Sequence, residues 1–580
     1  MKNILKRILI AVTAAVTMTA CIYEVIPQGG SQTQAQVSAS ESALKAMIKA
    51  FNPAMFCSGA AGYASAYGDH TDFGYPGIAL RLEHMLEDVA TMADNPYYNR
   101  FYAYDLNQAQ GHQYTYCAYF WDYYYTLIRL ANDVIASVKP IINENGSSEE
   151  DIEFKHIIGQ AYAYRAWFYL DLARQFEPKL NKYTDVRHIL GLTVPIVDEN
   201  TTIDDTKNNP RVSREAIYKF IFDDLARAEK YLDQSQTSFT APTMMAVYGM
   251  YARAYIELGA AYKENNGVNP NPDILPLTQE EAYRKAAEYA RKVIDESGKT
   301  PLTQSQWEDP VNGFNSGAAS DSWIWGLATS SENTINIITF TAHISSEGTW
   351  GYAPLSQICA SRRFYERISE GDFRKNSWLD PLYIQNPSAG QPYSYKFSGT
   401  DQDKVNFLSG TEMNPPAVPY QNIKFRPYQG ECSDYATGNC ADHPLMRVEE
   451  MYFIEMEAVA QTDLASAKSL LETFMDYRVT DGSYVCEASD LETFIDEMLF
   501  QKRVEFWGEG VVFHDYKRHG KGILRGYPGT NEAAVYAFNC EGRSPQWNIV
   551  ITRTEYQSNK GIKHPADNNP DPTEKLILWK

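Results

Sequence analysis

The chain has 580 residues, with 52 Lys and Arg against 73 Asp and Glu, which gives a formal net charge of -21. This balance excludes nucleic acid as the main partner, because binding a polyanion depends on an excess of Lys and Arg. Hydrophobic residues make up 44% of the chain and aromatic residues 13%, so the composition supports a large folded core.

The N-terminal segment has the order of an export signal. Lys2, Lys6 and Arg7 precede an apolar stretch over residues 8–16, and small residues follow as far as Cys21. The apolar stretch is about half of the ~20 residues that a membrane-spanning helix needs. We therefore expect residues 1–20 to be a signal peptide that is removed during export.

Cys21 ends the sequence "TMTAC", which resembles a bacterial lipobox. The resemblance implies that Cys21 becomes the lipidated first residue of the mature protein. The alternative is an ordinary secretory cleavage nearby. Residues 21–40 are rich in Gly, Ser and Gln, which is typical of a flexible tether between an anchor and a folded domain.

The other seven cysteines show no CxxC or Cys/His spacing of a metal site, and no cofactor motif is present. An odd number of cysteines cannot all form pairs. Cys432 and Cys440 either close a small disulfide loop in an oxidising compartment or remain free thiols, and the sequence leaves both alternatives open.

Apolar residues at three- and four-residue steps predict a series of helices. The clearest lies over residues 151–178, where Ile158, Arg165 and Leu172 share this spacing. Ser213 and Thr278 are placed as N-caps of two further helices, the second with Glu281 as a capping box. The same periodicity predicts helices at 213–232, 243–262, 278–295, 445–461, 463–478 and 491–508.

Small residues in the segments 284–297 and 463–478 occupy positions where neighbouring helices approach closely, as in degenerate tetratricopeptide repeats. The predicted fold is mostly α, with a tetratricopeptide-like scaffold of helical hairpins over about 41–299 and 444–525. Between about 300 and 443, Gly, Pro, Asn and Ser increase and helical periodicity fails. We expect residues 41–580 to form one domain in which 300–443 is a loop-rich, aromatic-rich, ligand-binding region.

The stretch "FQKRVEFWGEGVVFHDYKRHGKG" at 500–522 concentrates charge on a helix-like segment. Glu505 and Glu509, one helical turn apart, have the residue types of a general acid and base. The alternating signs also fit ion pairs that hold the scaffold together, and we favour this interpretation. His514 and His519 are five positions apart, which misses the four-residue step of a helical metal site.

Four segments together resemble the SusD/RagB-like outer-membrane lipoproteins of Bacteroidetes. They are the lipobox with "DFGYPGIALRLEHMLEDV", the helix "AYAYRAWFYLDLARQFEP" with the later "LTVPIV", the segment "PLMRVEEMYFIEMEAVA", and "KRVEFWGEGVVFHDYKRHG". The last is the most specific. In the two C-terminal segments the matching positions are Arg447, Glu450, Glu457, Ala458, Arg503, Glu505, Phe506, Glu509, Gly510, Asp515, Arg518 and Gly520.

The chain departs from the family pattern at two positions. Lys502 stands where the family usually has Glu, and Val512 where it usually has Arg. These changes predict that one structural ion pair is missing. The resemblance implies a lipid-anchored, cell-surface protein of the outer membrane that delivers a nutrient to a SusC-like TonB-dependent transporter and performs no catalysis.

Ligand-contacting residues vary within this family, so candidates come from composition alone. A sugar presents apolar C-H faces and hydroxyl groups, and therefore needs exposed aromatic rings beside polar side chains. Two regions provide both, a loop at 95–113 and the tryptophan-rich part of 300–443. The candidates are Tyr97, Tyr98, Phe101, Tyr102, Trp307, Phe314, Trp323, Trp325, Trp350 and Tyr352.

About half of the six rings in the tryptophan-rich region are expected in the core. Trp323 and Trp325 alternate about Ile324, which predicts a strand, and burial is as good an explanation for them as display. Trp350 lies between Gly348 and Gly351 and is the strongest candidate.

The working hypothesis is a binding protein for an oligosaccharide, a polysaccharide or another nutrient. Two alternatives come from other classes of protein. A secreted all-helical glycoside hydrolase requires a carboxylate such as Glu505 or Glu509 for turnover. A repeat scaffold that binds only protein requires no aromatic platform.

Overall fold

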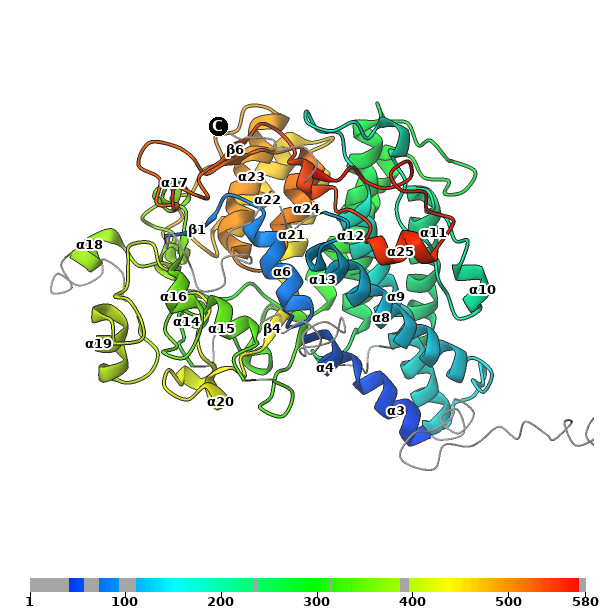
Figure 1. Cartoon of the computed structure of the whole chain (residues 1–580), viewed down its shortest axis with the longest axis horizontal. Coiled ribbons are helices and arrows are strands. Elements are labelled where there is room, and N and C mark those ends of the chain that lie inside the picture. The colour runs from blue at the N-terminus through cyan, green and yellow to red at the C-terminus, as the bar shows by residue number, and fades with distance from the viewer. Residues whose placement is uncertain are drawn as a thin grey trace, which may run out of the picture.

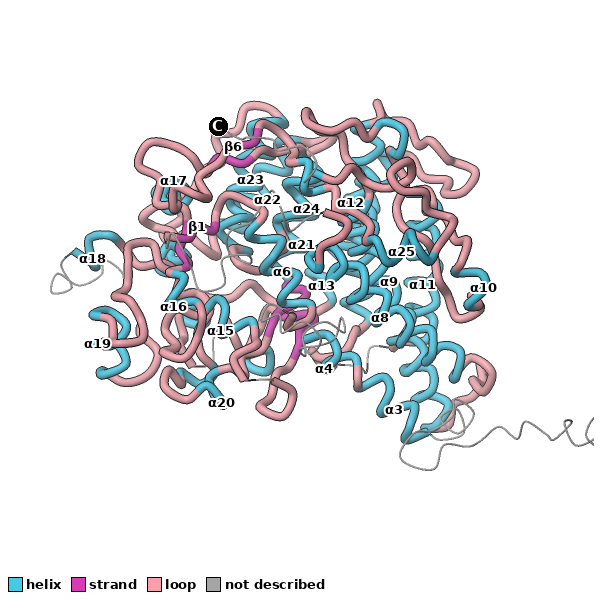
Figure 2. The backbone as a smooth tube through the Cα atoms, in the orientation of Figure 1, coloured by secondary structure: helices cyan, strands magenta, loops and turns pink. Residues whose placement is uncertain are grey.

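The computed structural model describes residues 41–56, 72–92, 111–233, 235, 237–311, 314–334, 336–385 and 396–572. These residues form stacked helical hairpins, with a loop-rich region along one side (Figures 1 and 2). The prediction of a mostly helical fold with tetratricopeptide-like hairpins is confirmed. The predicted signal peptide and tether lie outside the described residues.

The N-terminal helices occupy more than half of the scaffold. They are α3 (Glu41–Lys49), α4 (Phe51–Phe56), α6 (Tyr75–His84), α8 (Thr115–Val138), α9 (Glu149–Phe176), α10 (Ile203–Thr206), α11 (Arg214–Tyr231), α12 (Met244–Glu264) and α13 (Gln279–Glu296). The C-terminal helices complete it: α21 (Val448–Val459), α22 (Leu464–Met475), α23 (Leu491–Phe506), α24 (Val512–His519) and α25 (Arg553–Ser558).

Helix starts follow from capping side chains. Ser213 and Thr278 each accept a hydrogen bond from the backbone N–H three residues on, as predicted. Ser148 and Asp151 form a reciprocal capping box at the start of α9. Each such bond satisfies a backbone donor that the first helical turn leaves unpaired.

Arg165 of α9 ties three helices together. Its guanidinium donates to the carboxylate of Asp224 on α11 at 2.7 and 2.8 Å, and to Asn132 on α8 at 2.7 Å. Glu199 accepts a further bond at 2.7 Å. Because Arg165 is only 1% exposed, its charge is compensated entirely by these buried partners.

The region 300–443 contains only short helices, none longer than nine residues among those described. They are α14 (Gln304–Trp307), α15 (Phe340–Ile344), α16 (Ala353–Ser356), α17 (Arg362–Arg367), α18 (Pro381–Gln385), α19 (Asp401–Ser409) and α20 (Tyr435–Gly438). Figure 1 shows them, in green to yellow, along the side of the scaffold nearest α21–α24. The composition of this region therefore predicted its irregular backbone correctly.

In the described ranges, six short strands form three antiparallel pairs. β1 (Val89–Thr91) pairs with β3 (Ile358–Ala360), β2 (Trp323–Leu327) with β4 (His443–Arg447), and β5 (Ile523–Leu524) with β6 (Asn539–Cys540). Each pair joins segments distant in the sequence, except the β5–β6 hairpin. The strands thereby fasten the loop-rich region to the helical scaffold.

The predicted helix over 445–461 is wrong at its start. Residues 443–447 form strand β4, in which Arg447 pairs with Trp323 of β2, and α21 begins at Val448. The backbone N–H of Val448 donates to Ser322. The sequence periodicity predicted a helix here, but the backbone N–H and C=O groups of these residues instead form hydrogen bonds with a strand that is distant in the sequence.

Candidate functional site

Eight charged side chains meet in the interior between the helices and the loop-rich region. We call them the buried ionic frame: Asp372, Arg374, Lys424, Arg447, Glu449, Arg478, Glu505 and Glu509. Each is at most 5% exposed. Four carboxylates face four cations, so the frame is neutral as a whole, which is the condition under which buried charge is tolerated.

Glu505 is at the centre of the frame. One of its carboxylate oxygens accepts from Arg478 at 2.8 Å and from Arg374 at 3.1 Å. The other accepts from Arg478 at 2.9 Å and from Arg447 at 3.1 Å. Burial by itself raises the pKa of Glu505, but the guanidinium groups outweigh it and hold the pKa well below its usual range.

This environment does not suit acid–base catalysis. A general acid needs a pKa near the working pH and access to substrate, whereas Glu505 is fully buried and stays ionised. Glu509 is equally enclosed, because Lys424 donates to it at 2.8 Å and Arg447 at 3.0 Å. The scaffold interpretation of the charged stretch is the one that this geometry supports.

Lys502, one of the two departures from the family pattern, forms an ion pair of its own. Lys502 donates to Asp515 at 2.9 Å, with both side chains at most 3% exposed. Asp515 also accepts from Arg518, which binds Glu457 at 2.7 Å. Lysine at position 502 is therefore matched by a carboxylate on α24, so its charge is compensated within the chain.

A turn of two left-handed glycines separates α23 from α24. Gly508 and Gly510 have φ of 81° and 72°, values that favour glycine. A Cβ at Gly510 would lie 2.4 Å from the carbonyl oxygen of Ala79 on α6. The backbone N–H of Gly510 donates to Glu83 of α6 at 3.0 Å. The glycines therefore allow α6 to approach the turn that carries Glu509.

Glu83 should make stability depend on pH in the direction opposite to that of Glu505. Burial raises its pKa to about 8, against ~4.3 in an unfolded chain. The folded state then binds a proton that the unfolded state has released, so this group's contribution is present below pH ~4.3 and is lost as the pH rises toward 8. We expect Glu83→Gln to flatten the fall in unfolding free energy between pH 5 and pH 8, by up to about 1.4 kcal/mol per pH unit.

Urea unfolding of both proteins across that pH range tests this expectation. Glu288→Gln, at an exposed position on α13, serves as the control and should leave the slope unchanged. An unchanged slope in Glu83→Gln would show that Glu83 is already ionised in the folded protein.

Two of the rings predicted to bind ligand instead pack against cations of the frame. The charged group of Lys424 lies 5.2 Å from the ring centre of Trp307 and 4.7 Å from that of Phe314. Arg447 lies 5.9 and 5.2 Å from the same rings. Trp307 is 4% exposed and Phe314 1%, so they cannot present a face to a ligand here. Their role in this structure is to cover buried cations.

Three more candidate rings are also in the interior. Trp323 and Trp325 lie on a strand, as predicted, and both have no exposed surface. Trp325 packs against Trp167 of α9 with ring centres 4.7 Å apart. Tyr352 is 5% exposed and packs against His343. These rings join the loop-rich region to the scaffold, and burial is the reason that they are unsuited to a surface site.

Among the candidate rings in the described part of the chain, only Trp350 is partly exposed. Its indole lies over two glycines, because a Cβ at Gly348 would be 3.0 Å from the ring and one at Gly438 would be 2.6 Å from it. The neighbouring Thr349 is fixed by two hydrogen bonds to the carbonyl of Cys432 at 2.9 Å. The indole therefore packs closely against both glycines.

Two further side chains come from segments that contact Trp350 or its neighbour Thr349. Asn414 donates to the carbonyl of Thr349 at 2.9 Å. Tyr435 is 45% exposed on α20, the short helix whose Gly438 contacts Trp350. We call Trp350, Asn414 and Tyr435 the Trp350 patch. Tyr435 was missed from the sequence, although its neighbours in "SDYATGN" have the polar composition used to select the other candidates.

The remaining sequence candidates are placed as follows. Tyr97, Tyr98, Phe101 and Tyr102 lie outside the described residues, as does Cys21. Cys432 and Cys440 are free and buried, like the other four cysteines in the described ranges. No group of three or more His, Cys, Asp or Glu side chains in those ranges is arranged to hold a metal ion. No described helix has the length and apolarity needed to cross a membrane.

This geometry defines a helical-repeat protein with a buried ionic frame and a loop-rich face, and comparison with known proteins specifies its class. Residues 75–256 match the family model SusD-like_3, described as "Starch-binding associating with outer membrane". No curated protein matches the chain.

Solved structures resemble it over almost the whole length. A SusD-like carbohydrate-binding protein from Bacteroides vulgatus ATCC 8482 is 19% identical, with a TM-score of 0.65 and coverage of 90% of this chain and 97% of the other. Surface glycan-binding protein A from Bacteroides thetaiotaomicron, in complex with laminarihexaose, is 14% identical, with a TM-score of 0.59 and coverage of 90% and 98%. The chain therefore has a SusD-like fold, and residues 75–256 match a SusD-like family model, which confirms the predicted resemblance.

Proposed function

We propose that this protein captures an oligosaccharide or polysaccharide at the cell surface and delivers it to a SusC-like TonB-dependent transporter. The observation that carries the proposal is the SusD-like fold, shared over about nine-tenths of the chain with a protein whose structure contains laminarihexaose. The description of the matching family as starch-binding and outer-membrane associating supports both parts of the role.

The Trp350 patch is the proposed place of capture. Its partly exposed indole packs against two glycines, Asn414 bonds the carbonyl of the neighbouring Thr349, and Tyr435 is exposed on the short helix that contacts the ring. A rigid aromatic ring loses little conformational freedom when it binds a ligand. Residues 300–443 are then the binding region, carried by the scaffold at 41–299 and 444–525, and Cys21 is the site of the lipid anchor.

Capture without catalysis is the second part of the proposal. The two carboxylates that the hydrolase alternative requires, Glu505 and Glu509, are buried and saturated by cations. Neither is available to protonate a glycosidic oxygen or to activate water.

A glycan array tests the proposal directly, using protein that begins after Cys21. We expect binding to at least one glycan, confirmed by calorimetry, and no product when that glycan is incubated with the protein. Product formation overturns the capture role in favour of a hydrolase. Failure to bind any glycan on the array overturns the carbohydrate assignment and favours a peptide ligand or a protein-binding scaffold.

A further inference from the structure

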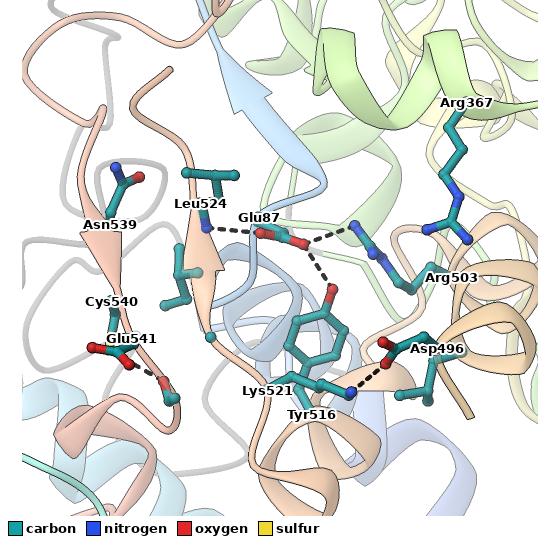
Figure 3. A pocket seen from close by; sticks show the side chains of 14 residues that line it. Glu87, Arg367, Asp496, Arg503, Tyr516, Lys521, Leu524, Asn539, Cys540 and Glu541 are labelled. Carbon is teal, nitrogen blue, oxygen red and sulfur yellow. Dashed lines mark hydrogen bonds and ion pairs between the residues drawn. The ribbon is translucent and has the colours of Figure 1, made fainter. Parts of the chain in front are cut away.

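A groove of about 530 Å³ lies between α23, α24 and the β5–β6 hairpin, and Figure 3 shows it closely. We call it the hairpin groove. A smaller pocket of about 70 Å³ continues it toward α17 and shares Glu87, Arg367, Arg503 and Leu524 with it. The hairpin groove shares no residue with the Trp350 patch, and β6 and α20 lie at opposite edges of the view in Figure 1.

One polar wall of the groove is held in place by hydrogen bonds within the protein. The carboxylate of Glu87 accepts from Arg503 at 3.0 Å, from the Tyr516 hydroxyl at 2.9 Å and from the backbone N–H of Leu524 at 2.7 Å (Figure 3). The guanidinium of Arg367 lies 3.8 Å from the ring centre of Phe500. Binding to such a preorganised wall costs little ordering of side chains.

Charge in the groove is balanced. Three cations, Arg367, Arg503 and Lys521, line it together with three carboxylates, Glu87, Asp496 and Glu541. Lys521 is paired with Asp496 across the opening (Figure 3). A ligand with a net charge of either sign would therefore lie against groups of its own sign.

Apolar surface lies between these charges. Leu499 and Ile523 are buried in the floor, and Leu524 is half-buried. Gly522 lets β5 approach β6 closely, because a Cβ there would lie 2.4 Å from the carbonyl oxygen of Cys540. The groove thus combines small apolar areas with donors and acceptors at fixed positions.

We propose that the hairpin groove is a second binding site, for a neutral polyhydroxylated ligand the size of one or two sugar units. A hydroxyl group both donates and accepts, so it can bond to a carboxylate and to a guanidinium without adding charge. The C–H face of a sugar ring can cover the half-buried Leu524. The volume falls within the ~300–1,000 Å³ of small-ligand pockets, and a protein partner would need a far larger surface.

The test uses maltose, cellobiose and laminaribiose as probes, observed by saturation-transfer NMR and titrated to a dissociation constant. The variant Arg367→Ala/Lys521→Ala removes two donors from the groove, one exposed and one half-buried. Its matched control, Arg284→Ala/Lys219→Ala, removes an arginine and a lysine that form exposed helix-surface pairs on α13 and α11. We expect at least one probe to bind the native protein and to lose about tenfold or more in affinity in the groove variant alone.

Trp350→Ala separates this site from the proposed capture site. Disaccharide binding at the groove should persist in Trp350→Ala, whereas binding of the array glycan should not. The inference is overturned if none of the three disaccharides binds, if the groove variant binds as tightly as its control, or if Trp350→Ala alone removes disaccharide binding. Each of these results leaves the proposed capture function standing, because that function depends on the array glycan and on Trp350.

Discussion

Replacing Glu505 with glutamine should lower the free energy of unfolding by about 3 to 5 kcal/mol, the cost of removing one partner from a buried ion pair. The amide keeps the size of the side chain but carries no charge. The frame then holds three carboxylates for four cations. The cations that lose a partner are Arg374, Arg447 and Arg478, each at most 1% exposed. An uncompensated guanidinium in the interior is expensive because protein provides far less solvation than water.

Denaturation in urea measures this effect as a shift in the midpoint at constant slope. Glu288→Gln is the matched control, since its partner Arg284 is an exposed residue on α13 and such pairs contribute at most about 1 kcal/mol. A loss below 1 kcal/mol in Glu505→Gln would contradict the frame as described, because it would mean that the carboxylate does not neutralise its three neighbours.

The frame also fixes the expected response to acid. The pKa of Glu505 is held below its usual range, so its contribution to stability is complete above the unfolded value of ~4.3 and is lost as the pH falls toward the folded value. Glu457, whose pKa is likewise lowered against its burial by Arg518, acts in the same direction. Stability should therefore fall steeply below pH 4, and less steeply in Glu505→Gln.

Trp350→Ala should weaken binding of the array glycan by about 30-fold or more, corresponding to the ~2 kcal/mol or more that a tryptophan anchor contributes at a binding site. The indole is partly exposed and lies on the backbone of Gly348 and Gly438, so its removal takes away the flat surface of the patch. Trp350→Phe retains a ring and should lose much less.

Calorimetry with the glycan identified on the array provides the measurement. Tyr477→Ala removes another partly exposed aromatic side chain, 39% exposed and beyond the end of α22, and should leave affinity unchanged. Thermal unfolding of Trp350→Ala establishes that the protein is folded. Unaltered affinity in a folded Trp350→Ala protein would move the capture site away from the Trp350 patch.

Much of the fold was predictable because helices and their caps depend on residues that are close together in the sequence. Helices α9, α11, α12 and α13 follow from apolar residues that repeat once per turn. The starts of α11 and α13 follow from Ser213 and Thr278, each of which accepts a hydrogen bond from the backbone N–H three residues on. The interpretation of Glu505 and Glu509 as structural also came from local pattern, since alternating charges at helical spacing form ion pairs. The match of four motifs to the SusD-like family then indicated the class.

The sequence by itself predicted most of the scaffold helices, the caps Ser213 and Thr278, the loop-rich character of 300–443 and the resemblance to a known family. Only the tertiary structure decided that Trp307 and Phe314 cover buried cations, that Lys502 finds Asp515, and that the backbone before α21 is a strand. The hairpin groove is likewise visible only in the tertiary structure, because its walls come from α17, α23, α24 and the chain after α6. The physical reason is that periodicity records neighbours within a few residues, whereas the burial of a ring or a charge is set by segments hundreds of residues apart.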